Sequence, residues 1–399
     1  MFTLELCFHM HVSQPPFEHY LRYTTLAISS LPRASPLFLT MGTEAAPLPM
    51  SRVSDVITTF RPSRLFKAPP PAAYTSVDFD DSGEFLLLSR TDDTIQLFNT
   101  KAGAHAKELK SQKYGSALAR FTHHSTSIIY ASTKVDDGIR YLSMHDNSFI
   151  RYFKGHTARV TSLSMSPNDD KFLSASLDNT VKLWDCRTAN NQGQLDFESP
   201  WLTAYDPSAT VIAIASPPAQ TVYLYDLRNY DKPPFATFDL LETEKRFEHL
   251  GQRPGEGWTG IEFSNNGRYV LVSTNGPGHY LLDAFNGDLV HYLHRPSGKT
   301  NHLAPGDVLN PSEANRNTFT QADAVMSPDG QFVIGGNGGQ TGLLVWDCRE
   351  SGKGDRILEP TTDLPSTRSA AVVAYNPRHN LVTSADKEVM LWIPDPDAA

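Results

Sequence analysis

Residues 159 to 185, RVTSLSMSPNDDKFLSASLDNTVKLWD, decide the fold. Apolar and polar side chains alternate in three short runs, and polar turn residues (SPNDD and then DN) separate the runs. A period of two indicates β-strands with one face buried, and the short turns place neighbouring strands antiparallel. The stretch therefore predicts a three-stranded antiparallel meander whose last strand is TVKLWD at 180–185.

The same pattern recurs between residues 61 and 393. Each copy has a first strand that ends at an aromatic residue or Met just before a polar turn, and the seven copies of this anchor are Phe79, Phe121, Met165, Tyr205, Phe263, Met326 and Tyr375. Successive anchors are 42, 44, 40, 58, 63 and 49 residues apart. These intervals are close to the ~40 to 45 residues of a four-stranded propeller blade.

One such meander cannot bury both of its faces, so the copies must stack radially into a ring. We therefore predict an all-β fold, a seven-bladed β-propeller over residues 50–393, with inserted loops at 240–257 and 294–318. The segment SRLFK (63–67) is expected to close the ring by completing the blade that ends at Trp392. Residues 1–49 are interpreted as a disordered extension or an artefact of an overlong gene model, and 394–399 as a tail.

Composition and charge narrow the function. The formal charge of −9 argues against direct nucleic-acid binding, which needs a dense Lys/Arg footprint. No apolar stretch is long enough for a membrane span. Three widely spaced cysteines form no metal-ligand motif, and the glycine cluster GGNGGQTG (335–342) lacks the GK[ST] ending of a phosphate loop. We expect no catalytic residues, no cofactor and no metal.

The third copy of the pattern resembles the WD-repeat propeller family. It carries Gly155-His156, the turn MSP at 165–167, and Trp184-Asp185. The resemblance implies a seven-bladed WD-repeat β-propeller. It also implies a structural tetrad in this blade, in which buried polar groups satisfy one another, made of His156, Ser176, Asp178 and Trp184.

A narrower resemblance covers residues 50–393 and is carried by KVDDGIRYLSMHDNSFIRYFKGH (134–156), YDLRNYDKPPFATF (225–238) and WTGIEFSNNGRYVLVSTNG (258–276). These segments are similar to the small WD-repeat subunit of the COMPASS histone H3 lysine-4 methyltransferase complex. That subunit is shared with the mRNA cleavage and polyadenylation factor, and its animal counterpart accompanies a protein phosphatase-1 assembly. The resemblance implies a non-catalytic nuclear scaffold whose partners are a SET-domain methyltransferase and polyadenylation-factor subunits, supporting histone methylation and transcription termination.

Partner-binding residues are sought among aromatic and cationic side chains on the loops and strand faces of the ring. Trp201 and Trp258 stand at the starts of first strands, where they are either exposed contact residues or packing between blades. Lys113, Tyr114 and Arg140 are further candidates.

An alternative function rests on WDCR, which occurs at Trp184–Arg187 and again at Trp346–Arg349. It resembles the WDxR box of substrate receptors of cullin ubiquitin ligases, and Arg187 and Arg349 would then contact the adaptor. The simpler interpretation is that each arginine lies over the rim of the ring and pairs with a nearby residue.

Overall fold

In the computed structural model, the stretch at 159–185 forms three antiparallel strands, β10 (Val160–Met165), β11 (Lys171–Ser176) and β12 (Thr180–Asp185). Phe172 lies opposite Trp184 and Leu173 opposite Leu183, so alternate side chains point to opposite faces of the sheet. A fourth strand, β13 (Gly193–Asp196), pairs along the outer edge of β12. The predicted meander is confirmed.

The structure describes residues 52–67, 72–251, 255, 257–300, 302–305, 320–350, 352, 354 and 356–397. All of them belong to one compact unit that covers 51–399. The extension predicted at 1–49, and residues 306–318 of the second predicted insertion, lie outside the described residues.

The first three blades each contain four consecutive strands in simple up-and-down order. Blade 1 contains β2 (Tyr74–Phe79), β3 (Phe85–Arg90), β4 (Thr94–Asn99) and β5 (Ala104–Lys110). Blade 2 contains β6 (Ala117–Phe121), β7 (Ser127–Ala131), β8 (Ile139–Ser143) and β9 (Ser148–Phe153). Blade 3 contains β10 to β13.

Blades 4 to 6 follow the same plan, with one added strand. Blade 4 contains β14 (Leu202–Tyr205), β15 (Val211–Ser216), β16 (Thr221–Asp226) and β17 (Ala236–Asp239). Blade 5 contains β18 (Trp258–Phe263), β19 (Tyr269–Thr274), β20 (Gly278–Asp283), β21 (Leu289–His294) and the added β25 (Ile357–Leu358). Blade 6 contains β22 (Ala324–Met326), β23 (Phe332–Gly336), β24 (Leu343–Asp347) and β26 (Thr362–Leu364).

The seventh blade joins the two ends of the described chain. It contains β27 (Val372–Tyr375), β28 (Val382–Ala385), β29 (Glu388–Pro394) and, outermost, β1 (Phe60–Lys67). β1 runs antiparallel to β29, with Pro62 opposite Trp392 and Leu65 opposite Met390. The predicted closure by the 63–67 segment is confirmed.

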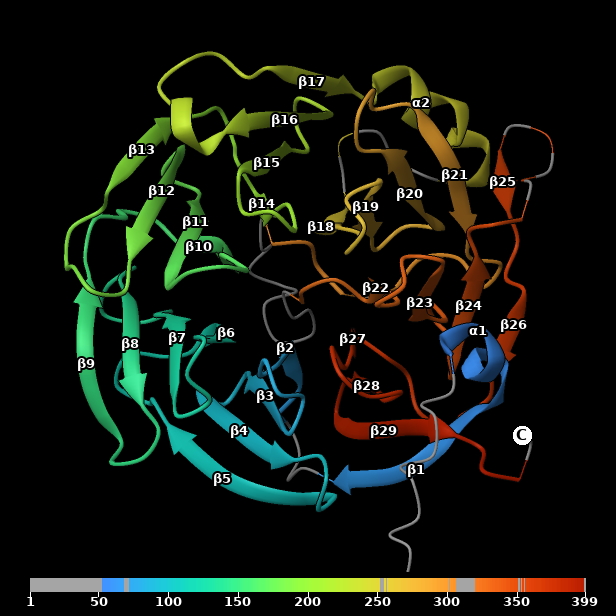
Figure 1. The fold of residues 1–399 in the computed structure, drawn as a ribbon, viewed down its shortest axis with the longest axis horizontal. Helices are drawn as coiled ribbons and strands as arrows, with labels where there is room; N and C mark the ends of the chain where they lie inside the picture. Colours follow the sequence, from blue (N-terminus) through green and yellow to red (C-terminus); the bar gives the residue numbers. More distant parts are fainter. Residues whose placement is uncertain are drawn as a thin grey trace, which may run out of the picture. The chain divides into compact units, whose positions relative to one another are not determined.

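Figure 1 shows the seven sheets arranged around a common axis, with β1 and β29 side by side. The innermost strands are β2, β6, β10, β14, β18, β22 and β27. Each predicted anchor is the last residue of one of these strands. Hydrophobic clusters fill the space between neighbouring blades; one of them combines Leu87 and Leu97 of blade 1 with Phe121 and Ile128 of blade 2. The seven-bladed, all-β prediction is confirmed.

Five short helices lie between the strands of the described residues or just before β1. They are α1 (Val53–Val56), η1 (Ile57–Thr59), η2 (Leu227–Asn229), α2 (Leu241–Arg246) and η3 (Glu248–Leu250). α2 and η3 occupy part of the insertion predicted as a loop at 240–257. This part folds against blade 5 because Phe247 is fully buried there and stacks on Tyr292, with ring centroids 3.9 Å apart. No helix in the described ranges is long and apolar enough to cross a membrane.

Candidate partner-binding site

The polar network of blade 3 is built around His156. Its Nδ1 lies 2.9 Å from Asp178 Oδ2, and its Nε2 lies 2.6 Å from Ser174 Oγ. The Trp184 indole donates to the same Ser174 oxygen at 2.8 Å. These contacts fit a neutral imidazole with its proton on Nδ1, and burial lowers the pKa of His156 in agreement with that form.

The serine of this tetrad is Ser174, and the prediction of Ser176 is wrong by one step along the same face of β11. Ser174 and Ser176 point the same way because they are two positions apart in the strand. Ser176 lies opposite Thr180, beyond the reach of the indole, and its hydroxyl donates instead to the backbone carbonyl of Ala158 at 2.8 Å.

The two WDCR arginines have exposed side chains and pair within their own turns. Arg187 donates through Nη2 to Asp185 Oδ2 at 2.6 Å, and these bonds lower the pKa of Asp185 to about 2. Arg349 makes the equivalent contact with Asp347, also at 2.6 Å. This geometry matches the simpler interpretation of the motif, in which the arginine pairs locally.

The two candidate tryptophans differ in exposure. Trp201 precedes β14 and is half-buried against the cluster between blades 4 and 5. Trp258 is fully buried, and its indole donates to Glu244 Oε1 of α2 at 2.7 Å. The insertion that carries α2 therefore covers Trp258, which packs inside the molecule and is not available as an exposed contact residue.

The other three candidates, Lys113, Tyr114 and Arg140, come together on the outer part of blade 2. The Arg140 guanidinium lies 3.6 Å from the centroid of the Tyr114 ring, and the Lys113 ammonium lies 5.0 Å from it. Phe149 and Tyr152 of β9 complete the group, with ring centroids 5.8 and 5.1 Å from the same guanidinium. We name these five residues the blade-2 cluster.

Arg140 is held firmly at the centre of the blade-2 cluster. Both oxygens of Asp136 accept from its Nη2 at 2.8 Å, and the Ser132 hydroxyl accepts from its Nε at 2.8 Å. Only 3% of Arg140 is exposed, whereas Phe149 and Tyr152 are 36% and 41% exposed. The buried cation thus fixes a set of aromatic rings that remain accessible, and cation–π contacts stabilise each ring.

A bulge in the outer hairpin places the two aromatic rings of β9 on one face. Leu142 lies opposite Phe149 and Arg140 opposite Tyr152, and the register shifts between these pairs. Phe149 and Tyr152 are three positions apart in the sequence, so a regular strand would point them in opposite directions. The extra residue in the bulged strand turns both toward Arg140.

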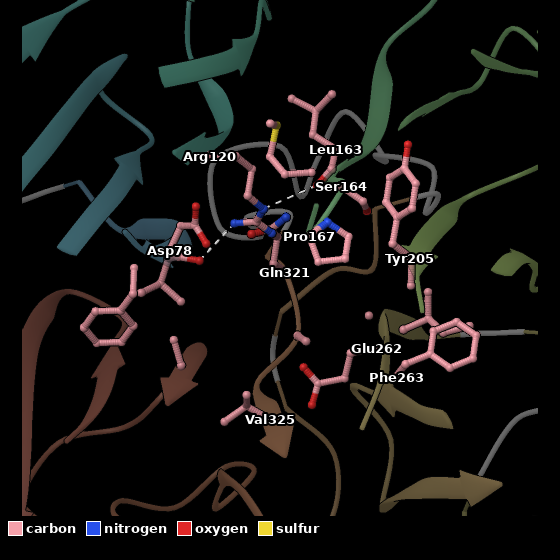
Figure 2. Close-up of a pocket in the computed structure, with 18 of the residues that line it drawn as sticks. Asp78, Arg120, Leu163, Ser164, Pro167, Tyr205, Glu262, Phe263, Gln321 and Val325 are labelled. Atoms are coloured by element: carbon pink, nitrogen blue, oxygen red, sulfur yellow. Dashed lines mark hydrogen bonds between the residues drawn. The ribbon is translucent and has the colours of Figure 1, made fainter. Parts of the chain in front are cut away.

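The central channel contains a cavity of about 770 Å³ lined by the innermost strands. Figure 2 shows Arg120 and Asp78 side by side in it, and Glu262 on another of the innermost strands. Arg120 donates to the backbone carbonyls of Val77 at 2.9 Å and Leu163 at 3.3 Å, and Asp78 accepts from the Phe121 amide at 2.7 Å. These side chains therefore tie the inner strands of neighbouring blades together.

Burial changes the acidity of the channel carboxyls. Desolvation raises the pKa of Asp78 to about 6 and that of Glu262 to about 7, although Glu262 accepts a hydrogen bond from the Met326 amide. Within the part of the chain that the structure describes, no three His, Cys, Asp or Glu side chains come close enough together to hold a metal ion.

Comparison with known proteins extends over most of the ring. WD repeat-containing protein 82 of Drosophila melanogaster is 34% identical over 86% of this chain and 96% of its own length. The chain belongs to this WD-repeat family. Set1 complex component swd2 of Schizosaccharomyces pombe is 34% identical over 80% of this chain and 92% of its own length. COMPASS component SWD2 of Saccharomyces cerevisiae is 32% identical, over 80% and 91% respectively.

The family model for the WD domain, G-beta repeat, matches residues 147–185. In this WD-repeat protein the matched segment starts at β9 of blade 2 and ends at β12 of blade 3. It therefore contains both the Ser174 tetrad and the two aromatic residues of β9 that belong to the blade-2 cluster.

Phe149, Ile150 and Tyr152 were missed by sequence reasoning, although one signal could have revealed them. An outer strand with one face in water should alternate polar and apolar residues, but SFIRYF (148–153) carries large apolar side chains at both parities. The channel side chains Asp78, Arg120 and Glu262 leave no such signal, because a charged residue in an inner strand is distinguished only by its position in the ring.

Proposed function

We propose that this chain is a non-catalytic scaffold subunit of a Set1-type, COMPASS-like histone H3 lysine-4 methyltransferase complex in the nucleus. The observation that carries the proposal is the similarity over nearly the whole propeller to proteins named Set1 complex component swd2 and COMPASS component SWD2. The inserted helix, the closing strand and the blade-2 cluster all lie on a rigid ring, which suits a protein that positions others.

In this role the ring binds a short segment of a larger subunit and stabilises it within the assembly. The blade-2 cluster is the surface we assign to that contact, because aromatic and arginine side chains fixed in place contribute most of the energy at protein interfaces. We further propose that the same chain serves the mRNA cleavage and polyadenylation factor and a protein phosphatase-1 assembly, in support of transcription termination. This part of the proposal rests on the family resemblance of the sequence.

Affinity purification from nuclear extract through a tag on the full-length chain tests the proposal. We expect a SET-domain methyltransferase and polyadenylation-factor subunits among the co-purified proteins, identified by mass spectrometry. The double variant Arg187→Glu and Arg349→Glu should recover the same set, because both arginines pair with their own aspartates. Recovery of mainly a cullin and its adaptor, lost in the double variant, would overturn the proposal in favour of a ubiquitin-ligase receptor.

A further inference from the structure

We propose that β9 accepts an extended, apolar segment of a partner subunit as a fifth strand of blade 2, with acidic residues beside the segment's apolar positions. The inference rests on the proposed function and specifies how the partner binds. Strand addition of this kind combines backbone hydrogen bonds along a free sheet edge with pockets for alternate side chains.

The outer strands of blades 1, 3 and 4 show what an ordinary exposed edge looks like in this protein. The exposed positions of β5 (AHAKELK), β13 (GQLD) and β17 (ATFD) carry polar side chains or Ala. None of them carries a large apolar side chain. β9 instead exposes Phe149 at 36%, Ile150 at 46% and Tyr152 at 41%. A cluster of large apolar side chains along one free edge marks an interaction site, because water contact with it is costly.

Blade 5 shows the arrangement that such an edge favours. Its outer strand β21 (LVHYLH) is also apolar, and there the chain itself supplies a fifth strand. β25 pairs with β21 in parallel, with Tyr292 opposite Ile357 and Leu293 opposite Leu358, and β21 is largely buried as a result. Within the described ranges, β9 has the composition of a covered outer strand but pairs with β8 alone.

The blade-2 cluster supplies anchors beside this edge. Arg140 fixes the Tyr114, Phe149 and Tyr152 rings before any partner arrives, so binding orders few side chains. The Tyr114 and Phe149 rings meet edge to face, with centroids 5.9 Å apart, and Phe149 contacts Tyr152 at 5.2 Å. The exposed parts of these rings offer a firm apolar floor for one or two side chains of the incoming strand.

The surroundings of β9 give the charge of the partner. The basic residues near β9 and the blade-2 cluster are Lys113, Arg151 and Lys154, against the exposed Asp146 just before β9, although the chain as a whole carries a formal charge of −9. Asp136 is neutralised by Arg140, the exposed Lys113 lies beside the Tyr114 ring, and the exposed Lys154 directly follows β9. A partner segment with carboxylates beside its apolar residues is complementary to this surface.

Selection of random displayed peptides of about ten residues, long enough to pair along β9, tests the inference on the full-length chain. We expect enriched peptides to alternate aliphatic residues with polar or acidic ones. Their affinity should fall on the order of tenfold or more for the Ile150→Ser/Tyr152→Ser double variant, which removes two exposed apolar contacts. The matched control is Phe285→Ser, because Phe285 is 93% exposed on a turn of blade 5 and lies far from β9 in the fold.

Two readouts separate strand addition from docking of side chains alone. In an enriched peptide, N-methylation of every second amide should abolish binding when it blocks the amides that face β9, and should leave binding intact when it blocks the alternate set. Hydrogen exchange of the backbone amides of residues 148–153 should slow in the complex. Binding that tolerates both N-methylated phases would overturn the inference, as would enriched peptides indifferent to the β9 variants. Both variants must remain folded at the temperature of the assay, which thermal unfolding checks; the double variant loses the Tyr152 contacts with Arg140 and Phe149 from the fold.

Three further outcomes concern the occupant and the proposed function. If peptides bind only after residues 1–49 are removed, the chain's own N-terminal segment is the fifth strand, and the inference of a partner is wrong. If the methyltransferase co-purifies equally with the β9 double variant and the parent chain, the inference fails while the proposed function stands. Failure to recover any such complex with the parent chain would count against the proposed function itself.

Discussion

The Ser174 hydroxyl satisfies one buried acceptor and one buried donor at once. It donates to His156 Nε2 and accepts from the Trp184 indole. Ser174→Ala leaves both groups without a partner, and we expect a loss of about 2 to 3 kcal/mol in the free energy of unfolding. Ser176→Ala removes two bonds to backbone groups, one donated to the Ala158 carbonyl and one accepted from the Asp178 amide, and we expect a loss of about 1 to 2 kcal/mol. Denaturant titration followed by tryptophan fluorescence measures both variants; a larger loss in Ser176→Ala would contradict the assignment of the tetrad.

Glu262 makes the stability of the ring depend on pH. Desolvation raises its pKa in the folded protein from 4.5 to about 7, so the folded state binds the proton more tightly than the unfolded state. The contribution of Glu262 is therefore fully present below about pH 4.5 and is lost as the pH rises through about 7. Glu262→Gln keeps an oxygen for the Met326 amide and removes the charge.

We compare the free energy of unfolding of the Glu262→Gln variant with that of the parent chain. Between about pH 5 and pH 8 the difference should shift on the order of 2 kcal/mol in favour of the variant. Thermal unfolding across this pH range measures the difference. Glu242→Gln is the control, because its carboxyl is exposed on α2. Parallel pH profiles for the parent chain and Glu262→Gln would show that the channel carboxyl has an ordinary pKa.

For single residues, the sequence predicted the strand face on which a side chain lies better than the side chains that it contacts. The resemblance to WD-repeat propellers placed His156, Asp178 and Trp184 in one network, but two serines share the face of β11, and only the register across the sheet distinguishes Ser174 from Ser176. Likewise Lys113, Tyr114 and Arg140 were chosen singly. The contact of Phe149 and Tyr152 with this group depends on the β9 bulge, which a period of two does not predict.

The closing strand β1 links two blades. It pairs with β29 of blade 7 along its length, and the Phe66 ring lies 4.7 Å from the Phe98 ring of blade 1. Phe66→Ala should therefore lower the free energy of unfolding by about 2 kcal/mol, below the full cost of a core phenylalanine because Phe66 is half-buried. Ser63→Ala, on the exposed part of the same strand, is expected to change little. An unchanged Phe66→Ala variant would mean that the ring does not depend on this contact.

Elements with a repeating pattern were predictable, and added elements were not. Every inner strand ends at its predicted anchor, and β1 closes the ring where expected, because both follow from the repeat. α2 and β25 belong to single insertions with no second copy to compare. Both depend on tertiary contacts. α2 is held by the burial of Phe247 against Tyr292, and β25 by the pairing of Leu358 with Leu293.

Two buried cysteines report on the integrity of the whole ring. Cys186 follows β12 in blade 3 and Cys348 follows β24 in blade 6, and both are free and buried. Burial raises the pKa of each thiol to about 12, so neither forms the reactive thiolate near neutral pH. We expect both to resist a thiol reagent until global unfolding and then to react together. Early labelling of one, located by mass spectrometry, would mean that its blade opens independently.

As a whole, the molecule is a closed ring whose outer strands differ in what they offer to partners. β21 is already covered by β25, β1 completes blade 7, and β9 is left with exposed apolar residues beside a fixed aromatic cluster. The similarity to Set1-complex and COMPASS components over 80% of this chain supports the use of this ring as a scaffold. Binding of the partner should then depend on β9 and should tolerate substitutions of exposed residues in other blades.

Quantitative mass spectrometry of complexes purified through the tagged full-length chain tests this account most directly. The parent chain and Phe285→Ser should recover a SET-domain methyltransferase in equal amounts, and Ile150→Ser/Tyr152→Ser should recover on the order of tenfold less while remaining folded. Recovery of no methyltransferase by the folded parent chain, or of a cullin and adaptor in its place, would contradict the account.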